Sequence, residues 1–147
     1  NKIYHSYSKN IVFIEDYAFL INALNDLSDK TMNFKYKDLA KRLSQEAIDK
    51  FFLTDKNIFQ KNLKKTNDIF FDPIDIGDST IPNGNAIMLI NFVRLGMLDE
   101  AKKLSESLNG YLNIYKSHMM TSLKAIDYFN NIVEGKNCNE QGCKIDL

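Results

Sequence analysis

The sequence predicts an all-α protein built from antiparallel helical hairpins. Apolar side chains recur every three or four residues in several separate segments, which is the spacing that one face of an α-helix produces. Gly96 and Gly135 follow two of these segments, at positions where helices commonly end. With 147 residues, 44% of them hydrophobic, the chain can bury one ordinary core.

Two helices are predicted in the first third of the chain, one from Glu15 to about Leu27 and one from Phe34 to Phe51. Both segments place their apolar residues on one helical face. These residues are Ile14, Tyr17, Ala18, Leu20, Ile21, Leu24 and Leu27 in the first helix, and Tyr36, Leu39, Ala40, Leu43, Ala47, Ile48 and Phe51 in the second. The regular spacing then breaks from Leu53 to Phe71, where Ile69-Phe70-Phe71 is predicted to form a short strand.

Three further helices are predicted: Ala86–Leu95, Leu98 to about Leu112, and about Ser117 to Val133. Gly96-Met97 is the expected turn between the first two. Residues 1–135 therefore form the helical domain, and residues 136–147 a polar, extended tail. We expect ten residues of the helical faces to be largely buried: Leu20, Leu24, Leu39, Leu43, Leu89, Val93, Ala101, Leu104, Leu123 and Ile126.

The segment 72–85 is the most distinctive part of the chain. It holds three aspartates, two asparagines, two prolines and two glycines, a composition typical of a structured loop. Asn83 or Asn85 is predicted to cap the helix that follows, whose positive N-terminal end then faces this carboxylate-rich loop. A polar loop that leads into a helix N-terminus is a suitable place for a binding site.

The charge pattern argues against two kinds of partner. Nineteen basic and nineteen acidic side chains cancel, and the densest basic run, Lys61-Asn62-Leu63-Lys64-Lys65, is too short for a nucleic-acid surface. No apolar stretch approaches the roughly 18–20 residues of a membrane span, and no signal peptide opens the chain. We therefore expect a cytoplasmic protein with neither nucleic acid nor a membrane as its partner.

The sequence contains no motif for metal or cofactor chemistry. It has no Ser/His/Asp triad, no glycine-rich phosphate loop and no HExxH element, so no metal and no cofactor are predicted. His5 and His118 are interpreted as surface or capping residues. Cys138 and Cys143 lack the two further ligands that a closed zinc site needs. Two reduced thiols, a disulfide and a redox pair all stay open for these cysteines.

Several polar residues have both a structural and a functional interpretation. Glu15 and Asp16 are either first-turn acids favoured by the helix dipole or a carboxylate pair that binds a ligand. Asp75 and Asp78 are either turn-forming residues or ligand contacts. Tyr17 suits the core, where its hydroxyl needs a partner.

The chain also resembles a known family. Its motifs are Ile14-Glu15-Asp16-Tyr17-Ala18-Phe19-Leu20, then Ile69-Phe70-Phe71-Asp72, then Pro82-Asn83-Gly84-Asn85 at the start of a helix that ends Val93-Arg94-Leu95. In this order they resemble the thioredoxin-domain-containing family that includes spermatogenesis-associated protein and its bacterial relatives. Cys138 and Cys143 are similar to a cysteine pair near the end of such proteins. The chain departs from the family pattern at Ile74, Gly77 and Asn83, where the family usually has lysine, an aromatic residue and serine.

The resemblance implies part of an (α/α)6 toroid, a ring of helical hairpins similar to N-acylglucosamine 2-epimerases. Five helices cannot close such a ring, so the chain is expected to be a C-terminal fragment that contacts the rest of a longer chain or a second copy. The implied function is to bind or modify a carbohydrate-like small molecule at the mouth of the toroid. The implied roles are acid–base or hydroxyl-binding groups at Asp16 and Asp78, a stacking face at Tyr17, and further ligand contacts at Glu15, Asp72, Asp75, Asn83 and Asn85.

Two observations keep other functions open. Epimerases of the toroid type rely on histidines, and neither histidine here sits in a catalytic motif, so any such histidine would lie elsewhere in the protein. The segment from Arg94 to Leu104 also resembles the helix–turn–helix of tetratricopeptide arrays, which bind partners without catalysis. No 34-residue period links it to the first two helices. A non-catalytic helical-repeat interaction module is therefore the alternative hypothesis.

Overall fold

The protein is all-α, as the sequence predicts. The computed structural model describes residues 3–5, 11–62, 74–135, 138–139 and 142–143. Within these residues the chain forms α1 (Ile14–Thr31), α2 (Phe34–Phe51), α3 (Gly84–Leu95), α4 (Leu98–Tyr115) and α5 (Met120–Val133), with a short 3-10 helix, η1 (Lys116–His118), before α5. Each of the five predicted helices is confirmed, with ends that shift by a few residues.

Two very small β-ladders accompany the helices. β1 (Phe52–Leu53) pairs antiparallel with β2 (Ile58–Phe59), and β3 (Cys138–Asn139) with β4 (Gly142–Cys143). The sequence did not predict them, because two residues are too few to show the alternation of a strand. The strand predicted at residues 69–71 lies outside the described residues.

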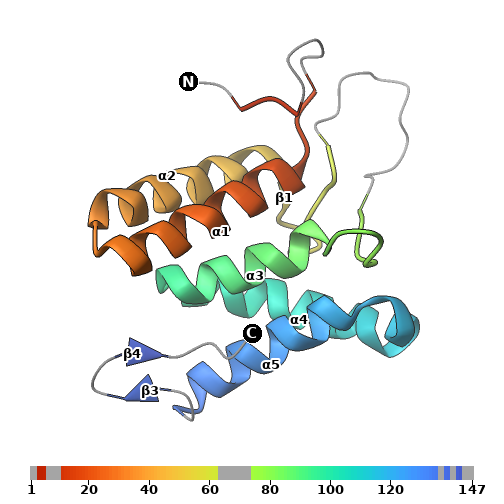
Figure 1. Ribbon diagram of the computed structural model, residues 1–147. Coiled ribbons are helices and arrows are strands. Elements are labelled where there is room, and N and C mark those ends of the chain that lie inside the picture. Colours follow the sequence, from red (N-terminus) through yellow and green to blue (C-terminus); the bar gives the residue numbers. More distant parts are fainter. Residues whose placement is uncertain (1–2, 6–10, 63–73, 136–137, 140–141, 144–147) are drawn as a thin grey trace.

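The helices form two layers (Figure 1). In the first layer α3 lies between α1 and α5, and α2 and α4 lie behind it. The three helices of the first layer run parallel. Gly84 at the start of α3 lies against Ile14 at the start of α1, while Arg94 near the end of α3 pairs with Asp26 and Asp29 near the end of α1. Asn83, just before α3, donates a hydrogen bond at 3.2 Å to Ser122 near the start of α5, so all three helices of this layer begin at the same end of the molecule.

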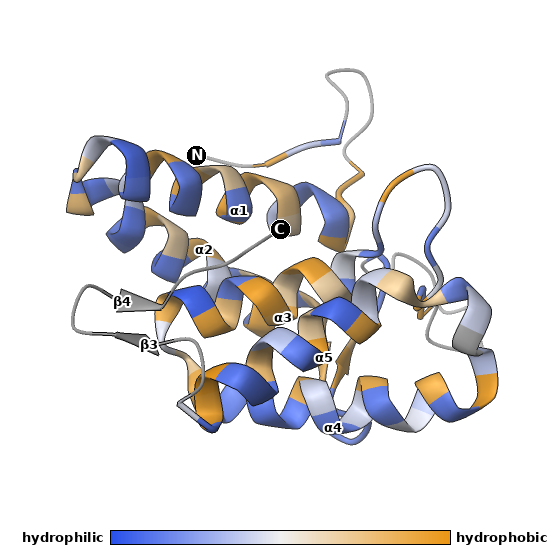
Figure 2. Cartoon of the chain, turned by 60° about the horizontal axis from the view of Figure 1, so that its bottom comes forward, coloured by the Kyte–Doolittle hydropathy of each residue, from blue (hydrophilic) through white to orange (hydrophobic). Residues whose placement is uncertain are grey.

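The core is centred on α3. Its hydrophobic stretches stand out in Figure 2, and every residue from Gly84 to Val93 is buried. A helix that is apolar on most sides needs neighbours on most sides, and α1, α2, α4 and α5 all contact it. Buried polar residues also lie in this core, among them Asn91, which donates to the carbonyl oxygen of Ala18 at 2.8 Å and accepts from Asn25 at 3.3 Å.

Most of the burial predictions are confirmed, and two are wrong. Leu24, Leu89, Val93, Ala101, Leu104 and Ile126 are buried, and Leu39 and Leu43 are half-buried. Leu20 is 39% exposed and Leu123 is 49% exposed. Helical spacing shows that a residue belongs to an apolar stripe, but the width of the stripe that a neighbouring helix covers depends on packing.

No helix in the described part of the chain is both long enough and apolar enough to cross a membrane.

Candidate functional site

The candidate site is a polar pocket at the end of the molecule where α1, α3 and α5 begin. It has a volume of about 200 Å³. Residues from four separate segments line it: His5, Phe13, Glu15, Lys61, Asp75, Gly77, Ser79, Ile81, Pro82 and Asn83. We call it the polar pocket. It brings together Glu15, Asp75 and Asn83 from the set that the sequence predicted.

Glu15 is the unusual group in this pocket. Its Oε2 atom is buried and accepts no hydrogen bond from any residue that the structure describes. Burial raises the pKa of the Glu15 carboxyl above its usual value, and the negative charges of Asp75 and Asp16 add to this effect. The backbone N–H of Glu15 and the Lys61 ammonium act in the opposite direction. A buried carboxylate oxygen without a hydrogen bond destabilises the folded protein. A hydrogen-bond donor bound at this atom would remove that cost.

Lys61 and Asp75 form the charged wall of the polar pocket. The Lys61 Nζ atom lies 2.7 Å from Asp75 Oδ2, and both side chains are partly exposed. This hydrogen bond raises the pKa of Lys61. Sequence reasoning missed Lys61, which it assigned to a short basic run. The only sequence feature that could have indicated a role for Lys61 in the site is its position between two segments rich in aspartate and asparagine.

Asp78 has a structural role between two helix starts. Its Oδ1 atom accepts from the backbone N–H and side-chain amide of Asn83 at 3.2 and 3.0 Å, and its Oδ2 accepts from the backbone N–H of Thr121 at 2.8 Å. Burial alone would raise the pKa of the Asp78 carboxyl. The hydrogen bonds from Thr121 and Asn83 together have the larger effect, so the pKa lies below its usual value. The carboxylate is thus held ionised at the N-termini of α3 and α5.

Asp16 also has its carboxylate engaged locally. Oδ2 accepts from the backbone N–H of Phe13 at 2.9 Å, an interaction that caps the start of α1. Oδ1 lies 2.9 Å from His5 Nδ1. Neither Asp16 nor Asp78 is among the pocket-lining residues, so their predicted catalytic role stays a prediction while their helix-capping contacts are visible.

The two asparagines have different functions in the fold. Asn83 is the N-cap of α3, since its Oδ1 accepts from Ala86 N at 2.9 Å. Asn85 is fully buried and connects the start of α3 to β2 and to the loop at Asp75 by hydrogen bonds. It accepts from Phe59 N at 2.9 Å and donates to the carbonyl oxygens of Phe59 and Asp75, each at 3.1 Å.

Tyr17 lies in the core between α1 and α2, away from the polar pocket. It is fully buried, and its ring packs against Phe51. Its hydroxyl donates to Glu46 at 2.6 Å and accepts from Lys50 at 2.9 Å. Burial and the Glu46 hydrogen bond raise the pKa of Tyr17. The stacking role predicted for Tyr17 therefore has no support from its position.

Three predicted residues fall wholly or partly outside the description. Asp72 lies outside the described residues. The backbones of Cys138 and Cys143 pair across β3 and β4, but nothing of their side chains is described. The described residues contain no group of three or more His, Cys, Asp or Glu side chains placed to hold a metal ion.

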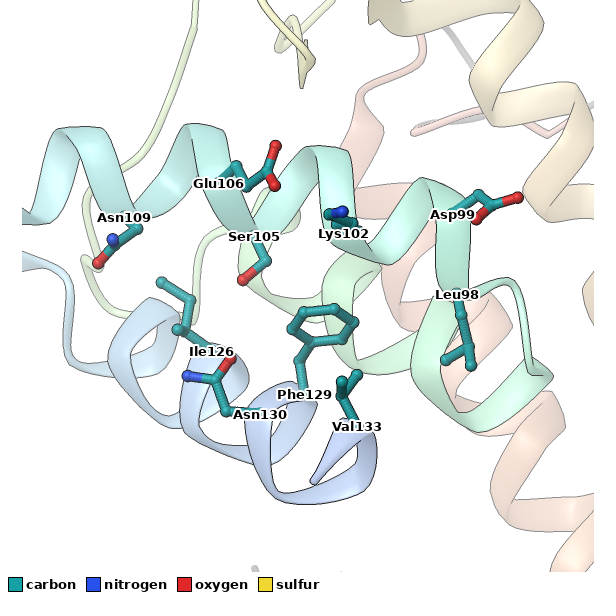
Figure 3. Close-up of a pocket in the computed structure, with 10 residues that line it drawn as sticks. All are labelled: Leu98, Asp99, Lys102, Ser105, Glu106, Asn109, Ile126, Phe129, Asn130 and Val133. Atoms are coloured by element: carbon teal, nitrogen blue, oxygen red, sulfur yellow. The ribbon is translucent and has the colours of Figure 1, made fainter. Parts of the chain in front are cut away.

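A second hollow, which we call the α4–α5 groove, lies between those two helices and has a volume of about 520 Å³ (Figure 3). Its floor is apolar, and its rim carries charged and amide side chains. The lining residues are Leu98, Asp99, Lys102, Ser105, Glu106, Asn109, Ile126, Phe129, Asn130 and Val133. The groove is larger than the polar pocket but lacks an unsatisfied buried charge.

Comparisons with known proteins do not identify the chain: no protein-family model matches it, and no curated protein matches it significantly.

Proposed function

We propose that this helical domain binds a small polyhydroxylated, carbohydrate-like molecule in the polar pocket. The observation that carries the proposal is the buried, unpartnered Oε2 atom of Glu15. A ligand hydroxyl would donate a hydrogen bond to this oxygen and remove the cost of leaving it unsatisfied. A carboxyl of raised pKa is also suited to exchanging a proton with a bound hydroxyl.

The other walls of the polar pocket match the same ligand class. Sugar hydroxyls donate and accept at once, and Asp75 offers an acceptor beside the Lys61 donor. A volume of about 200 Å³ is below the range of roughly 300–1,000 Å³ for drug-sized ligands, so a single sugar ring or a short polyol suits it best. In this proposal Glu15, Lys61 and Asp75 contact the ligand, whereas Asp16 and Asp78 position the surrounding helices and loop.

The arrangement of the helices supports the toroid that the resemblance implies. An (α/α)6 toroid has an inner ring of parallel helices and an outer ring that runs the other way. Here α1, α3 and α5 form one parallel layer, with α2 and α4 behind it. We therefore propose that the chain is part of such a ring, in a protein of the thioredoxin-domain-containing type, and that the polar pocket lies at its mouth.

The alternative, a regular helical-repeat module, receives less support. The first-layer helices begin at residues 14, 84 and 120, so their two intervals are very unequal. A tetratricopeptide array repeats at a constant interval of about 34 residues. The hairpin β1–β2 and the segment after it make the first interval long, and this same segment supplies Lys61 and Asp75 to the pocket.

The test is protein-observed NMR titration with a panel of monosaccharides and linear polyols. We expect the amide signals of Glu15, Gly77 and Asn83 to shift with at least one compound. Glu15→Gln and Lys61→Met should each weaken binding by about tenfold, the loss that corresponds to one hydrogen bond to a charged group. The control is Glu100→Gln on α4, far from the pocket in sequence and not among its lining residues. The absence of shifts at tens of millimolar ligand would contradict the proposal.

A further inference from the structure

The α4–α5 groove has a buried apolar floor, where Ile126 and Phe129 are each 8% exposed, and exposed apolar side chains at one end. Phe129 points from α5 toward α4 at its centre (Figure 3), and Leu98 and Val133 at one end are 43% and 60% exposed. Leu123, predicted to be buried, continues the same side of α5 beyond Ile126. The apolar stripe of α5 is therefore wider than its contacts with α3 and α4 require, which indicates a surface built for a further contact.

The rim of the groove carries a charge pattern with no internal partners. Asp99, Lys102 and Glu106 follow one another on α4 at positions i, i+3 and i+7, so they lie on one side of the helix. Among the described residues, none of the three forms an ion pair. The order of charges along the rim is negative, positive, negative.

The exposed face of α2 carries the opposite pattern. Lys35, Asp38 and Arg42 also stand at i, i+3 and i+7, and all three are exposed. None of them takes part in an ion pair within the part of the chain that the structure describes. The order of charges on α2 is positive, negative, positive.

We propose that the α4–α5 groove receives α2 of a second copy of this chain, with α2 antiparallel to α4. Both stripes have the same i, i+3, i+7 spacing, so antiparallel pairing sets their three charges against one another. It places Lys35 opposite Glu106, Asp38 opposite Lys102, and Arg42 opposite Asp99, so that every charged pair has opposite signs.

The size of the groove and one apolar anchor agree with this pairing. The groove follows α4 from Leu98 to Asn109, a length of roughly 16 Å at 1.5 Å per residue, which three turns of a helix fill. Phe34, at the start of α2, is 68% exposed. Antiparallel docking brings it to the end of the groove formed by Asn109 and Ile126, where its ring would be removed from water.

The contact joins different surfaces of the two copies, so it is heterologous and leads to a ring or an open chain of copies. A formal net charge of zero leaves no overall repulsion against association. The proposal does not depend on a ligand in the polar pocket.

Sedimentation velocity from about 1 to 200 µM at low salt tests this contact. We expect concentration-dependent association that weakens with added salt, because the rim charges are exposed. Asp99→Lys and Arg42→Glu should each reduce the association constant by about tenfold, since each turns an attraction into a repulsion. The double variant should restore it, because Lys at position 99 then faces Glu at position 42 of the next copy. Val133→Ser should weaken association without a change in the circular dichroism spectrum.

The matched control is Lys103→Glu, an exposed charge on α4 outside the groove, which should leave association unchanged. A protein that stays monomeric over the whole concentration range would overturn the proposal, because a second copy would then not occupy the groove. An association that the Asp99→Lys/Arg42→Glu double variant fails to restore would also overturn it.

Discussion

The Asp78 carboxylate accepts a hydrogen bond at 2.8 Å from the backbone N–H of Thr121, which lies 43 residues further along the chain. Through the same carboxylate it also holds Asn83, the N-cap of α3. One side chain thus fixes the starts of two helices next to the polar pocket. Negative charge at a helix N-terminus is favourable, and here it acts on two helices at once.

Replacing Asp78 by alanine should therefore destabilise the protein. The change leaves the Thr121 N–H and the Asn83 amide without their acceptor, and we expect a loss of about 2 kcal/mol in the free energy of unfolding. Urea unfolding followed by circular dichroism measures it. Lys103→Ala, at an exposed position on α4, should change stability by less than about 0.5 kcal/mol. Equal effects of the two substitutions would show that the capping contacts contribute little.

The shifted pKa values of Asp78 and Glu15 should give opposite pH dependences of stability. Asp78 has a lowered pKa in the folded protein, so its contribution is present above the unfolded value of 3.8 and is lost as the pH falls through the folded pKa. Glu15 has a raised pKa, so the folded state binds its proton more tightly. Its contribution is therefore present below 4.5 and is lost as the pH rises through the folded pKa.

Glu15→Gln should consequently raise the melting temperature at pH 7, by about 1–3 °C, and have a smaller effect at pH 4. Glutamine keeps the size of the side chain and removes the buried charge. Thermal unfolding of both proteins at the two pH values measures the difference. A residue that costs stability and is nevertheless present is typical of a binding site, so a loss of stability in Glu15→Gln at pH 7 would argue against a ligand-binding role.

Two glycines within helices should respond in opposite ways to alanine. A Cβ atom at Gly84 would lie 3.0 Å from Ile14 Cγ2 and 3.3 Å from the Glu15 backbone nitrogen, so the start of α1 would have to shift slightly to make room. We expect Gly84→Ala to cost about 1–3 kcal/mol. A Cβ at Gly110 in α4 meets no atom within 4 Å, and Gly110→Ala should stabilise the protein by about 0.5–1 kcal/mol. Urea unfolding of both variants compares them directly.

Asn85→Ala, in the first turn of α3, should be among the most damaging single substitutions near the polar pocket. It removes three hydrogen bonds and leaves the buried N–H and carbonyl of Phe59 without partners. The expected cost is about 2–4 kcal/mol. Amide hydrogen exchange should show faster exchange at Phe59 in the variant than in the parent protein. Unchanged protection of that amide would mean that Asn85 does not hold β2 in place.

The sequence by itself determined the helices and several of their ends. Apolar spacing depends on neighbours three and four residues apart, so it is readable locally. The stop at Gly96 and the stop before Gly135 have the same local origin, since both glycines adopt the left-handed backbone that ends a helix. The sequence also predicted an asparagine cap at the start of α3, but it left Asn83 and Asn85 open, and the structure shows that Asn83 is the cap.

Only the tertiary structure decided which polar groups meet. Glu15, Lys61 and Asp75 are far apart in the sequence, and no local pattern shows that α1, α3 and the β1–β2 hairpin bring them to one pocket. The same holds for Asp78, because its partner Thr121 comes within reach only when α5 packs beside α3. It also holds for Leu123, because its exposure depends on which helices lie next to α5. Periodicity records what each segment can bury, whereas the packing of distant segments fixes what is buried, paired or left open.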